Sequence, residues 1–294
     1  MINGFTLGEE QILTYLAKSD YLFTTTLSDE FISFGLNWYK SLARINEHNN
    51  SLIICLNKPG FETLQRLKIP SVLLEVPNYK NENRADWIEL EKFYKAAGPV
   101  YINQKYKKDI VFSDADIVFF KNPIPKLREE IAQGYDIVVI SDKRFDPFVV
   151  GRKKGRLVML NHDKKSTTDY GIQDQVLYGE SNGAFGYFPY SEKVISLFSA
   201  LTPTSEYARS FPTGIEAGAA QTIFNKRLKE LNVKTKVLSV FEFPNGSVWK
   251  VPYLKEKIKD TCYIVHYNFC ELCDPLPSRD YKINWMKQDG TWLL

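Results

Sequence analysis

Asp114 and Asp116, separated by one residue, are the side chains of this chain best suited to bind a cation. An apolar run at residues 110–112 precedes them and a second run at residues 117–120 follows. At the end of a strand, two such residues project from the same side and can reach one ligand. Two carboxylates held that close repel each other and lose hydration, a cost that a divalent cation removes. Oxygen ligands suit Mg²⁺ or Mn²⁺, so the pattern predicts a metal site; the alternative is a solvated turn.

His266 is a candidate third ligand. It is one of three histidines and follows an apolar run at residues 262–265. We therefore expect it at the end of a strand, where sheets of the α/β class bind ligands. A lone histidine is more often structural, and that reading stays open. A rival arrangement joins His266 to Cys270 and Cys273, but it offers zinc only three ligands.

The elements that would position these residues alternate along the chain. Strands are predicted at residues 21–26, 51–56 and 71–76, with helices between them. This β-α-β-α-β order favours a parallel sheet with right-handed crossovers. Later strands are expected up to Asp114 and at residues 117–120 and 135–141. Helices are expected at residues 81–97, from Pro99 to about 107, and at residues 192–201 and 214–231.

Residues 142–170 interrupt this order with a polar insertion, in which residues 157–160 could form a strand. Such an insertion is either a surface loop or a lid. Its basic side chains could meet an anionic substrate, although a run of charges is more often a solvated face. They are Lys143, Arg144, Arg152, Lys153, Lys154, Arg156, Lys164 and Lys165.

The composition is that of a globular protein. Of 294 residues, 44% are hydrophobic and 25% charged, which predicts a packed core. The net charge of +3, without a basic stripe, argues against nucleic acid as the main partner. The sequence contains no run of about 18 apolar residues, so no transmembrane span is predicted. The first ten residues lack the basic and apolar regions of a signal peptide. Four cysteines are too few for a disulfide scaffold in a chain of this size.

The wording of residues 111–123, VFSDADIVFFKNP, resembles the nucleotide-diphospho-sugar transferase family, which includes plant cell-wall α-xylosyl- and arabinosyltransferases. The resemblance implies one α/β domain over residues 1–294 of GT-A (Rossmann-like) type. Its mostly parallel central sheet would be flanked by helices, with a short antiparallel extension after the Asp-x-Asp motif. Residues from about 20 to 123 would bind the nucleotide, and residues from about 124 to 294 the donor sugar and acceptor.

The resemblance also assigns roles to residues. Asp116 would ligate the metal, Asp114 would contact ribose or metal, and His266 would complete the metal shell. The expected contacts to the donor are Thr24, Thr25, Thr26, Arg84, Lys95, Asp114, Ala115, Asn182 and Gly183. The expected catalytic residues are Asp174, Glu216 and Gln221.

The helix containing Gln221 departs from the family pattern. Ala220 stands where relatives have an aspartate that contacts the donor sugar, which puts the donor's identity in doubt. Glu216, one helical turn earlier, or Asp174 could supply that carboxylate. The segment at residues 182–185, Asn-Gly-Ala-Phe, resembles the one that lines the family's sugar site, and otherwise reads as a glycine turn.

The expected function is therefore metal-dependent transfer of a sugar from a UDP- or GDP-sugar, with Mn²⁺ or Mg²⁺, to a hydroxyl of a glycan or glycoconjugate. The resemblance suggests retention of configuration. A sugar nucleotidyltransferase is one alternative, but residues 24–29 lack the glycines of its phosphate loop. A non-catalytic carbohydrate-binding protein with a decayed site is another. Without an anchor, the chain is expected in a bacterial or virus-infected cytoplasm, or in the Golgi lumen if an anchor was removed.

Overall fold

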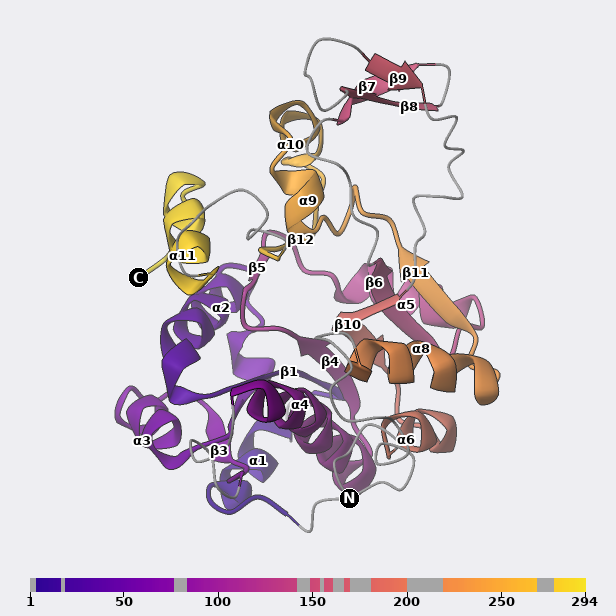
Figure 1. Cartoon of the computed structure of the whole chain (residues 1–294). Helices are drawn as coiled ribbons and strands as arrows, with labels where there is room; N and C mark the ends of the chain where they lie inside the picture. The colour runs from indigo at the N-terminus through magenta and orange to yellow at the C-terminus, as the bar shows by residue number, and fades with distance from the viewer. Residues whose placement is uncertain are drawn as a thin grey trace.

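The structure is a computed structural model that describes residues 4–16, 19–76, 84–141, 149–153, 156–160, 167–169, 181–199, 219–268 and 278–294. Its centre is a seven-stranded sheet of order β11-β6-β10-β4-β1-β2-β3, in which only β10 is antiparallel to its neighbours (Figure 1). The strands are β1 (Tyr21–Leu27), β2 (Ser51–Cys55), β3 (Ser71–Leu73), β4 (Asp109–Ser113), β6 (Ile137–Ser141), β10 (Ser181–Phe188) and β11 (Thr235–Leu238). The predicted parallel α/β sheet is confirmed.

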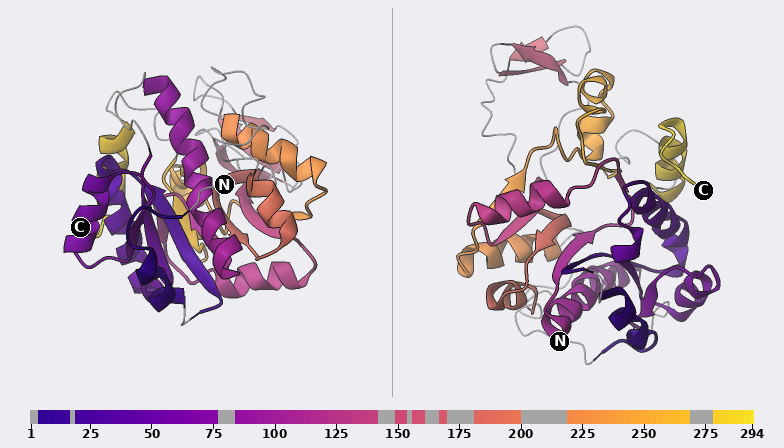
Figure 2. Two further views of the ribbon diagram at one scale, coloured as in Figure 1. Left: turned by 90° about the horizontal axis from the view of Figure 1, so that it is seen from below. Right: turned by 180° about the vertical axis from the view of Figure 1, so that it is seen from behind.

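Helices cover both faces of this sheet (Figures 1 and 2). One face packs against α1 (Glu9–Leu16), α4 (Arg84–Tyr106), α6 (Glu192–Ser199) and α8 (Ala219–Glu230). The other packs against α2 (Ile32–Arg44), α3 (Lys58–Arg66) and α5 (Ile124–Ala132). Successive strand residues alternate between the two cores, as Ile110 and Val111 of β4 do, because strand side chains alternate faces.

The prediction of a separate helix opening at Pro99 is wrong. Residues 84–106 form the single helix α4, with Pro99 inside it. The preceding residue, Gly98, lies so close to the sheet that an added Cβ would be 2.7 Å from Ile54 Cδ1. Burial of this face, including Ala97 and Ile102, stabilises the helix enough to offset the hydrogen bond that proline cannot donate.

A two-stranded antiparallel sheet follows the Asp-x-Asp motif, as expected. It pairs β5 (Ile117–Phe119) with β12 (Ile264–His266). Behind it, α9 (Gly246–Trp249), α10 (Pro252–Ile258) and α11 (Ser278–Gln288) share a third apolar core with β5, β12 and α2. Trp285 and Trp292 belong to this core, which confirms that the C-terminal tail packs back on the domain.

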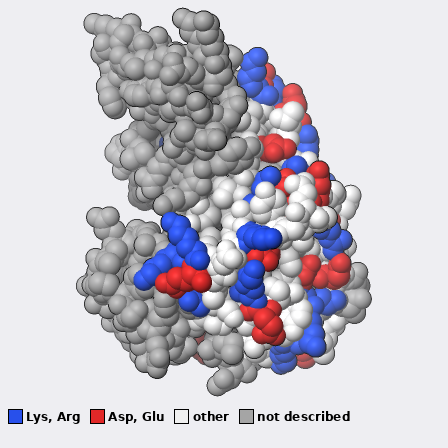
Figure 3. All heavy atoms as spheres, turned by 90° about the vertical axis from the view of Figure 1, so that its right-hand side faces the viewer, with Lys and Arg blue, Asp and Glu red and all other residues white. Residues whose placement is uncertain are grey.

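The insertion contains a three-stranded antiparallel sheet of β7 (Val149–Lys153), β8 (Arg156–Leu160) and β9 (Thr167–Asp169), at the top of Figure 1. The strand predicted at residues 157–160 lies within β8. No helix in the described part of the chain is long and apolar enough to cross a membrane. On the face in Figure 3, basic and acidic side chains are interspersed over the described surface, so no field of one sign dominates it.

Candidate active site

Asp114 and Asp116 lie in a tight turn between β4 and β5 rather than on a strand. The Ile117 N–H donates to the Asp114 carbonyl at 3.2 Å, which closes the turn. Strand alternation was therefore the wrong reason for expecting the two carboxylates to meet. The turn is held from both sides: Trp38 Nε1 donates to Ser113 Oγ at 2.6 Å, and the Asp114 N–H donates to the Ala184 carbonyl at 2.7 Å.

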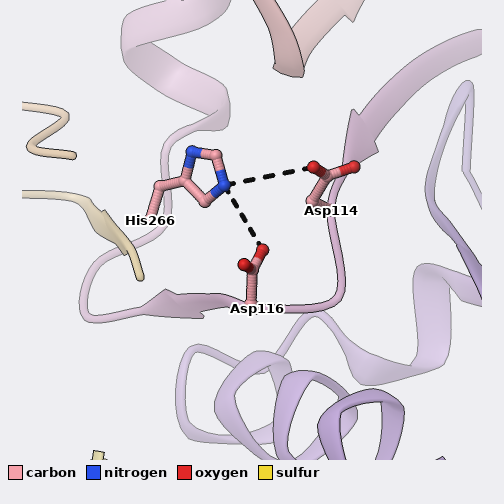
Figure 4. Close-up of side chains that lie close together, drawn as sticks. All are labelled: Asp114, Asp116 and His266. Atoms are coloured by element: carbon pink, nitrogen blue, oxygen red, sulfur yellow. Dashed lines mark ion pairs between the residues drawn. The ribbon is translucent and has the colours of Figure 1, made fainter. Parts of the chain in front are cut away.

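Strand pairing brings His266 to this turn. In the antiparallel register of β5 and β12, His266 is opposite Ile117, the residue after Asp116. Its Nε2 lies 3.3 Å from Asp116 Oδ1 and 4.0 Å from Asp114 Oδ2, and it faces both carboxylates in Figure 4. One potential ligand atom from each of the three side chains lies within 4.8 Å of the others. Residues distant in sequence thus form one compact cluster.

Two lysines face the carboxylates. Lys95 Nζ of α4 lies 3.5 Å from Asp114 Oδ1, and Lys282 Nζ of α11 lies 2.7 Å from Asp116 Oδ2. Burial alone would raise the pKa of Asp116, but the charges of Lys282 and His266 and their hydrogen bonds outweigh it. The pKa of this carboxyl is therefore held well below its ordinary value, and Asp116 is an anion at neutral pH.

Lys282 is a site residue that the sequence reasoning missed. It lies in the polar helix α11, and no motif around it distinguishes it from a surface lysine. Its position next to Asp116 depends on how the C-terminal tail packs. In the sequence, Lys282 differs in no way from the other basic residues of α11, such as Arg279 and Lys287.

The donor set fits a hard or borderline divalent cation such as Mn²⁺ or Mg²⁺. Two carboxylates and one imidazole converge, and oxygen with imidazole nitrogen suits these metals. His266 is only 4% exposed, and its Nδ1 has no hydrogen-bond partner among the residues that the structure describes. If Nε2 bound the cation, Nδ1 would carry the proton, which in metal sites is commonly donated to an acceptor.

A cleft opens beside the cluster. It is lined by Thr26, Leu27, Phe31, Phe34, Lys95, Asp114, Ala115, Asp116 and Lys282. Of the three threonines predicted to contact the donor, Thr26 lines this cleft. Thr24 and Thr25 are fully buried within β1, so the structure does not bring their side chains to it. Ala115, also predicted, is part of the lining.

Asn182 and Gly183 lie on β10, next to the Asp-x-Asp turn. Asn182 Oδ1 accepts from the Ala184 N–H at 2.8 Å, and the Ala184 carbonyl in turn binds Asp114. The pairing of β10 with β6 shifts register between residues 182 and 186. A Cβ added at Gly183 would meet nothing within 4 Å, so open space borders this backbone.

The structure does not describe the side chains of the remaining predicted residues. Asp174 and Glu216 lie outside the described residues, as do Cys270 and Cys273 of the rival zinc arrangement. Arg84 and Gln221 lie in α4 and α8, but their side chains are not among those described.

The two residues after His266, Tyr267 and Asn268, make hydrogen bonds that hold the end of β12 in place. Asn268 Oδ1 accepts from the Gly246 N–H at 3.0 Å, which fixes the end of β12 against α9. Tyr267, the neighbour of His266, donates to Asp289 Oδ2 at 3.0 Å. Asp289 also accepts from Trp249 Nε1 at 2.7 Å and pairs with Lys255, so β12, α9, α10 and the end of α11 are joined at one carboxylate.

Solved structures of low sequence identity are similar to this chain. The glycosyltransferase GlyE of Streptococcus pneumoniae TIGR4 matches with a TM-score of 0.50 and 10% identity, over 92% of this chain and 64% of that one. Its apo form matches at 0.47 and 10%, over 92% and 63%. The apo bifunctional glycosyltransferase WbbM matches at 0.48 and 11%, over 85% and 46%. The chain thus spans about half to two thirds of the length of these proteins.

The architecture is the expected GT-A type, and the sequence supplies the family. No curated protein matches the sequence. The model of the nucleotide-diphospho-sugar transferases matches residues 104–274, the segment that holds Asp114, Asp116 and His266. This match does not single out the plant cell-wall group within the family. Because it covers more than half of the chain, the protein belongs to the nucleotide-diphospho-sugar transferase family.

Proposed function

We propose that this chain transfers a sugar from a nucleotide-diphosphate donor, a UDP- or GDP-sugar, to a hydroxyl of a glycan or glycoconjugate. One observation carries the proposal: Asp114, Asp116 and His266 converge beside a cleft at the carboxyl end of β4. Ligands of α/β sheets bind at such strand ends. Family membership supports the class of reaction, and the convergence of these three side chains supports the proposed location of the site.

Asp114, Asp116 and His266 would hold Mn²⁺ or Mg²⁺. When bound, the cation would supply positive charge to the diphosphate as the sugar leaves. Lys95 and Lys282 would also neutralise the negative charge of the diphosphate, because both line the cleft and offer ammonium groups to phosphate oxygens. Arg84 is proposed as a further cation for the diphosphate.

The cleft has an apolar and a polar part. Leu27, Phe31 and Phe34 form an apolar wall on which a base or ribose could pack, next to the Thr26 hydroxyl and Ala115. Asn182 and Gly183 border the turn on its other side, where the donor sugar would lie. In this proposal residues from about 20 to 123 bind the nucleotide, and residues from about 124 to 294 the sugar and acceptor.

An acceptor hydroxyl would attack the anomeric carbon with retention of configuration. The departing phosphate would take the hydroxyl's proton, so no base from the chain is required. Transfer with inversion would need a carboxylate as general base, and Asp174 or Glu216 would be the candidates. Gln221 is proposed to contact the donor sugar from α8.

The test is a thermal-shift panel of UDP-, GDP- and other nucleotide sugars, with and without Mn²⁺. Wild type should be stabilised by one nucleotide class only when Mn²⁺ is present. At a ligand concentration 100 times the Kd the stabilisation is about 2.7 kcal/mol, or roughly 5 °C in Tm. Asp116→Ala should lose the shift. Asp260→Ala, at an exposed aspartate after α10, is the matched control and should keep it.

A shift that Asp116→Ala retains in full would contradict the proposed site. No shift with any nucleotide sugar would contradict donor binding. Hydrolysis of the identified donor, followed by NMR of the released sugar before its anomers equilibrate, would then distinguish retention from inversion. A metal-independent hydrolysis would contradict the role given to the cation.

A further inference from the structure

The ion pair of Lys282 and Asp116 is an unusual feature for a carboxylate proposed to bind a metal. Lys282 Nζ lies 2.7 Å from Asp116 Oδ2, while Oδ1 of the same carboxylate faces His266 Nε2 at 3.3 Å. Both members of the pair are largely buried, the side chain of Lys282 being 19% exposed and that of Asp116 15%. Both oxygens of Asp116 are thus already engaged by protein groups.

An ammonium and a divalent cation cannot share this carboxylate at close range. Each neutralises the same largely buried anion, and two positive charges brought together at that carboxylate repel each other. A metal ion within roughly 2.0–2.6 Å of the Asp116 oxygens would therefore drive the ammonium away. In the absence of metal, the Lys282 ammonium therefore neutralises the Asp116 carboxylate, as a bound divalent cation would.

Lys282 has the means to move while its helix stays in place. Helix α11 is anchored by Trp285 and Met286 in the third core and, just past its end, by Asp289 to Tyr267 and Trp249. The lysine side chain, by contrast, is a flexible four-carbon stem. It borders the cleft, which gives the ammonium room to turn away from Asp116 without displacing α11.

We propose that Lys282 is the resident counter-ion of Asp116 and competes with the divalent cation for this carboxylate. This inference rests on the proposed function, since it takes Asp114, Asp116 and His266 as the metal site. Lys282 sets the metal affinity: the wild-type protein binds Mn²⁺ more weakly than a variant with a neutral, unbranched side chain of similar length. The ion pair also stabilises the metal-free protein, because it leaves no unpaired anion inside the site.

The experiment measures binding of Mn²⁺ alone, without nucleotide, by the EPR signal of the free ion. Lys282→Met keeps an unbranched apolar stem of similar length but removes the charge, and it should bind Mn²⁺ about tenfold more tightly than wild type. Lys282→Arg keeps the charge and should bind no more tightly than wild type. Lys287→Met is the matched control, an exposed lysine of the same helix, and should equal wild type.

Thermal unfolding provides a second measurement, which does not depend on enzyme activity. Without metal, Lys282→Met should melt below wild type, and saturating Mn²⁺ should remove or reverse that difference, because the ion binds only the native state. Equal or weaker Mn²⁺ binding by Lys282→Met, with normal binding by wild type, would overturn the competition and leave the proposed function standing. Absence of Mn²⁺ binding in wild type and all three variants would overturn the metal site itself and the competition with it.

Discussion

At the scale of single residues, the site is a balance of charges that the fold brings within a few ångströms. Asp114 and Asp116 are each matched by one lysine, and His266 faces both carboxylates. Buried anions need such partners, since an unpaired carboxylate in a poorly hydrated site costs several kcal/mol. The role of each side chain in the cluster can therefore be tested by a substitution that removes its charge or its metal ligand.

Replacement of His266 should weaken metal binding more than it weakens the fold. His266→Ala removes one of three proposed ligands, and we expect the affinity for Mn²⁺ to fall by about 100-fold or more, since loss of even an outer partner of a ligand costs 10–100-fold. Titration of the variant with Mn²⁺, followed by the EPR signal of the free ion, measures the change.

His48→Ala is the control for this substitution. His48 lies in the short turn before β2, where its ring contacts Tyr39 rather than the carboxylates. It should bind Mn²⁺ as wild type does. If His266→Ala also binds Mn²⁺ with wild-type affinity, the imidazole is not a ligand, and its place beside Asp116 is that of a hydrogen-bond partner only.

The sequence predicted Asp114, Asp116, His266 and Lys95 as site residues, but not Lys282. Asp114 and Asp116 lie between two apolar runs, where charged residues are unusual and so point to a function. His266 directly follows a third apolar run. Lys282 has no such context, because a lysine in a polar helix is the ordinary case. Its pairing with Asp116 spans 166 residues and depends on the packing of the tail, which local patterns do not encode.

At the scale of elements, β12 places His266, and its end is set by a close contact with α9. A Cβ added at Gly246 would lie 1.8 Å from the Asn268 carbonyl oxygen, far inside any real contact. Gly246→Ala must therefore move β12 or α9. We expect a loss of about 3 kcal/mol or more in the free energy of unfolding, the upper end for overpacking, measured by urea denaturation.

The same substitution elsewhere provides the comparison. Gly183 borders open space, so Gly183→Ala should change the free energy of unfolding by less than about 1 kcal/mol. It should weaken donor binding if the sugar approaches this backbone as proposed. Equal stability of Gly246→Ala and wild type would mean that the contact with Asn268 relaxes at little cost.

Element order was more predictable than element boundaries. The first three strands are almost wholly buried and separated by helices, a pattern with few solutions other than a parallel sheet. The break expected at Pro99 failed because packing on the sheet outweighs a local preference. The break between the strands that end at Asp114 and begin at Ile117 was expected, but the two carboxylates were placed by strand alternation, whereas a turn closed by the Ile117 N–H holds them.

At the scale of the whole molecule, the C-terminal tail and the described N-terminal segment, residues 4–16, are tied to different parts of the domain. The tail packs on α2, where Trp292 contacts Phe34 and the Leu293 N–H donates to Asn37 Oδ1 at 2.6 Å. Because α11 and the tail carry Lys282, tail packing and the charge of the site are linked. The N-terminal segment is instead fixed to α4, through Glu9.

Glu9 should make the stability of the molecule depend on pH in the acid range. Its carboxylate accepts from Tyr101 Oη at 2.6 Å, from Tyr106 Oη at 3.0 Å and from the Phe5 N–H at 3.2 Å, and it pairs with Lys105. Burial alone would raise the pKa, but these hydrogen bonds outweigh it and lower the pKa of Glu9 from 4.5 to about 2. A carboxyl with a lowered pKa in the folded state stabilises the fold above about pH 4.5, and this contribution is lost as the pH falls toward 2.

Glu9→Gln tests this link, because the amide does not titrate in this range. Urea denaturation at pH 6, 4.5 and 3 should show wild type losing more stability than Glu9→Gln over the interval, so that the two curves converge in acid. Other carboxyls titrate too, so the informative quantity is the difference between the two proteins at each pH. Glu10→Gln, at the exposed neighbouring position, should parallel wild type. A constant difference between Glu9→Gln and wild type at all three pH values would mean that Glu9 contributes through packing and neutral hydrogen bonds, not through its charge.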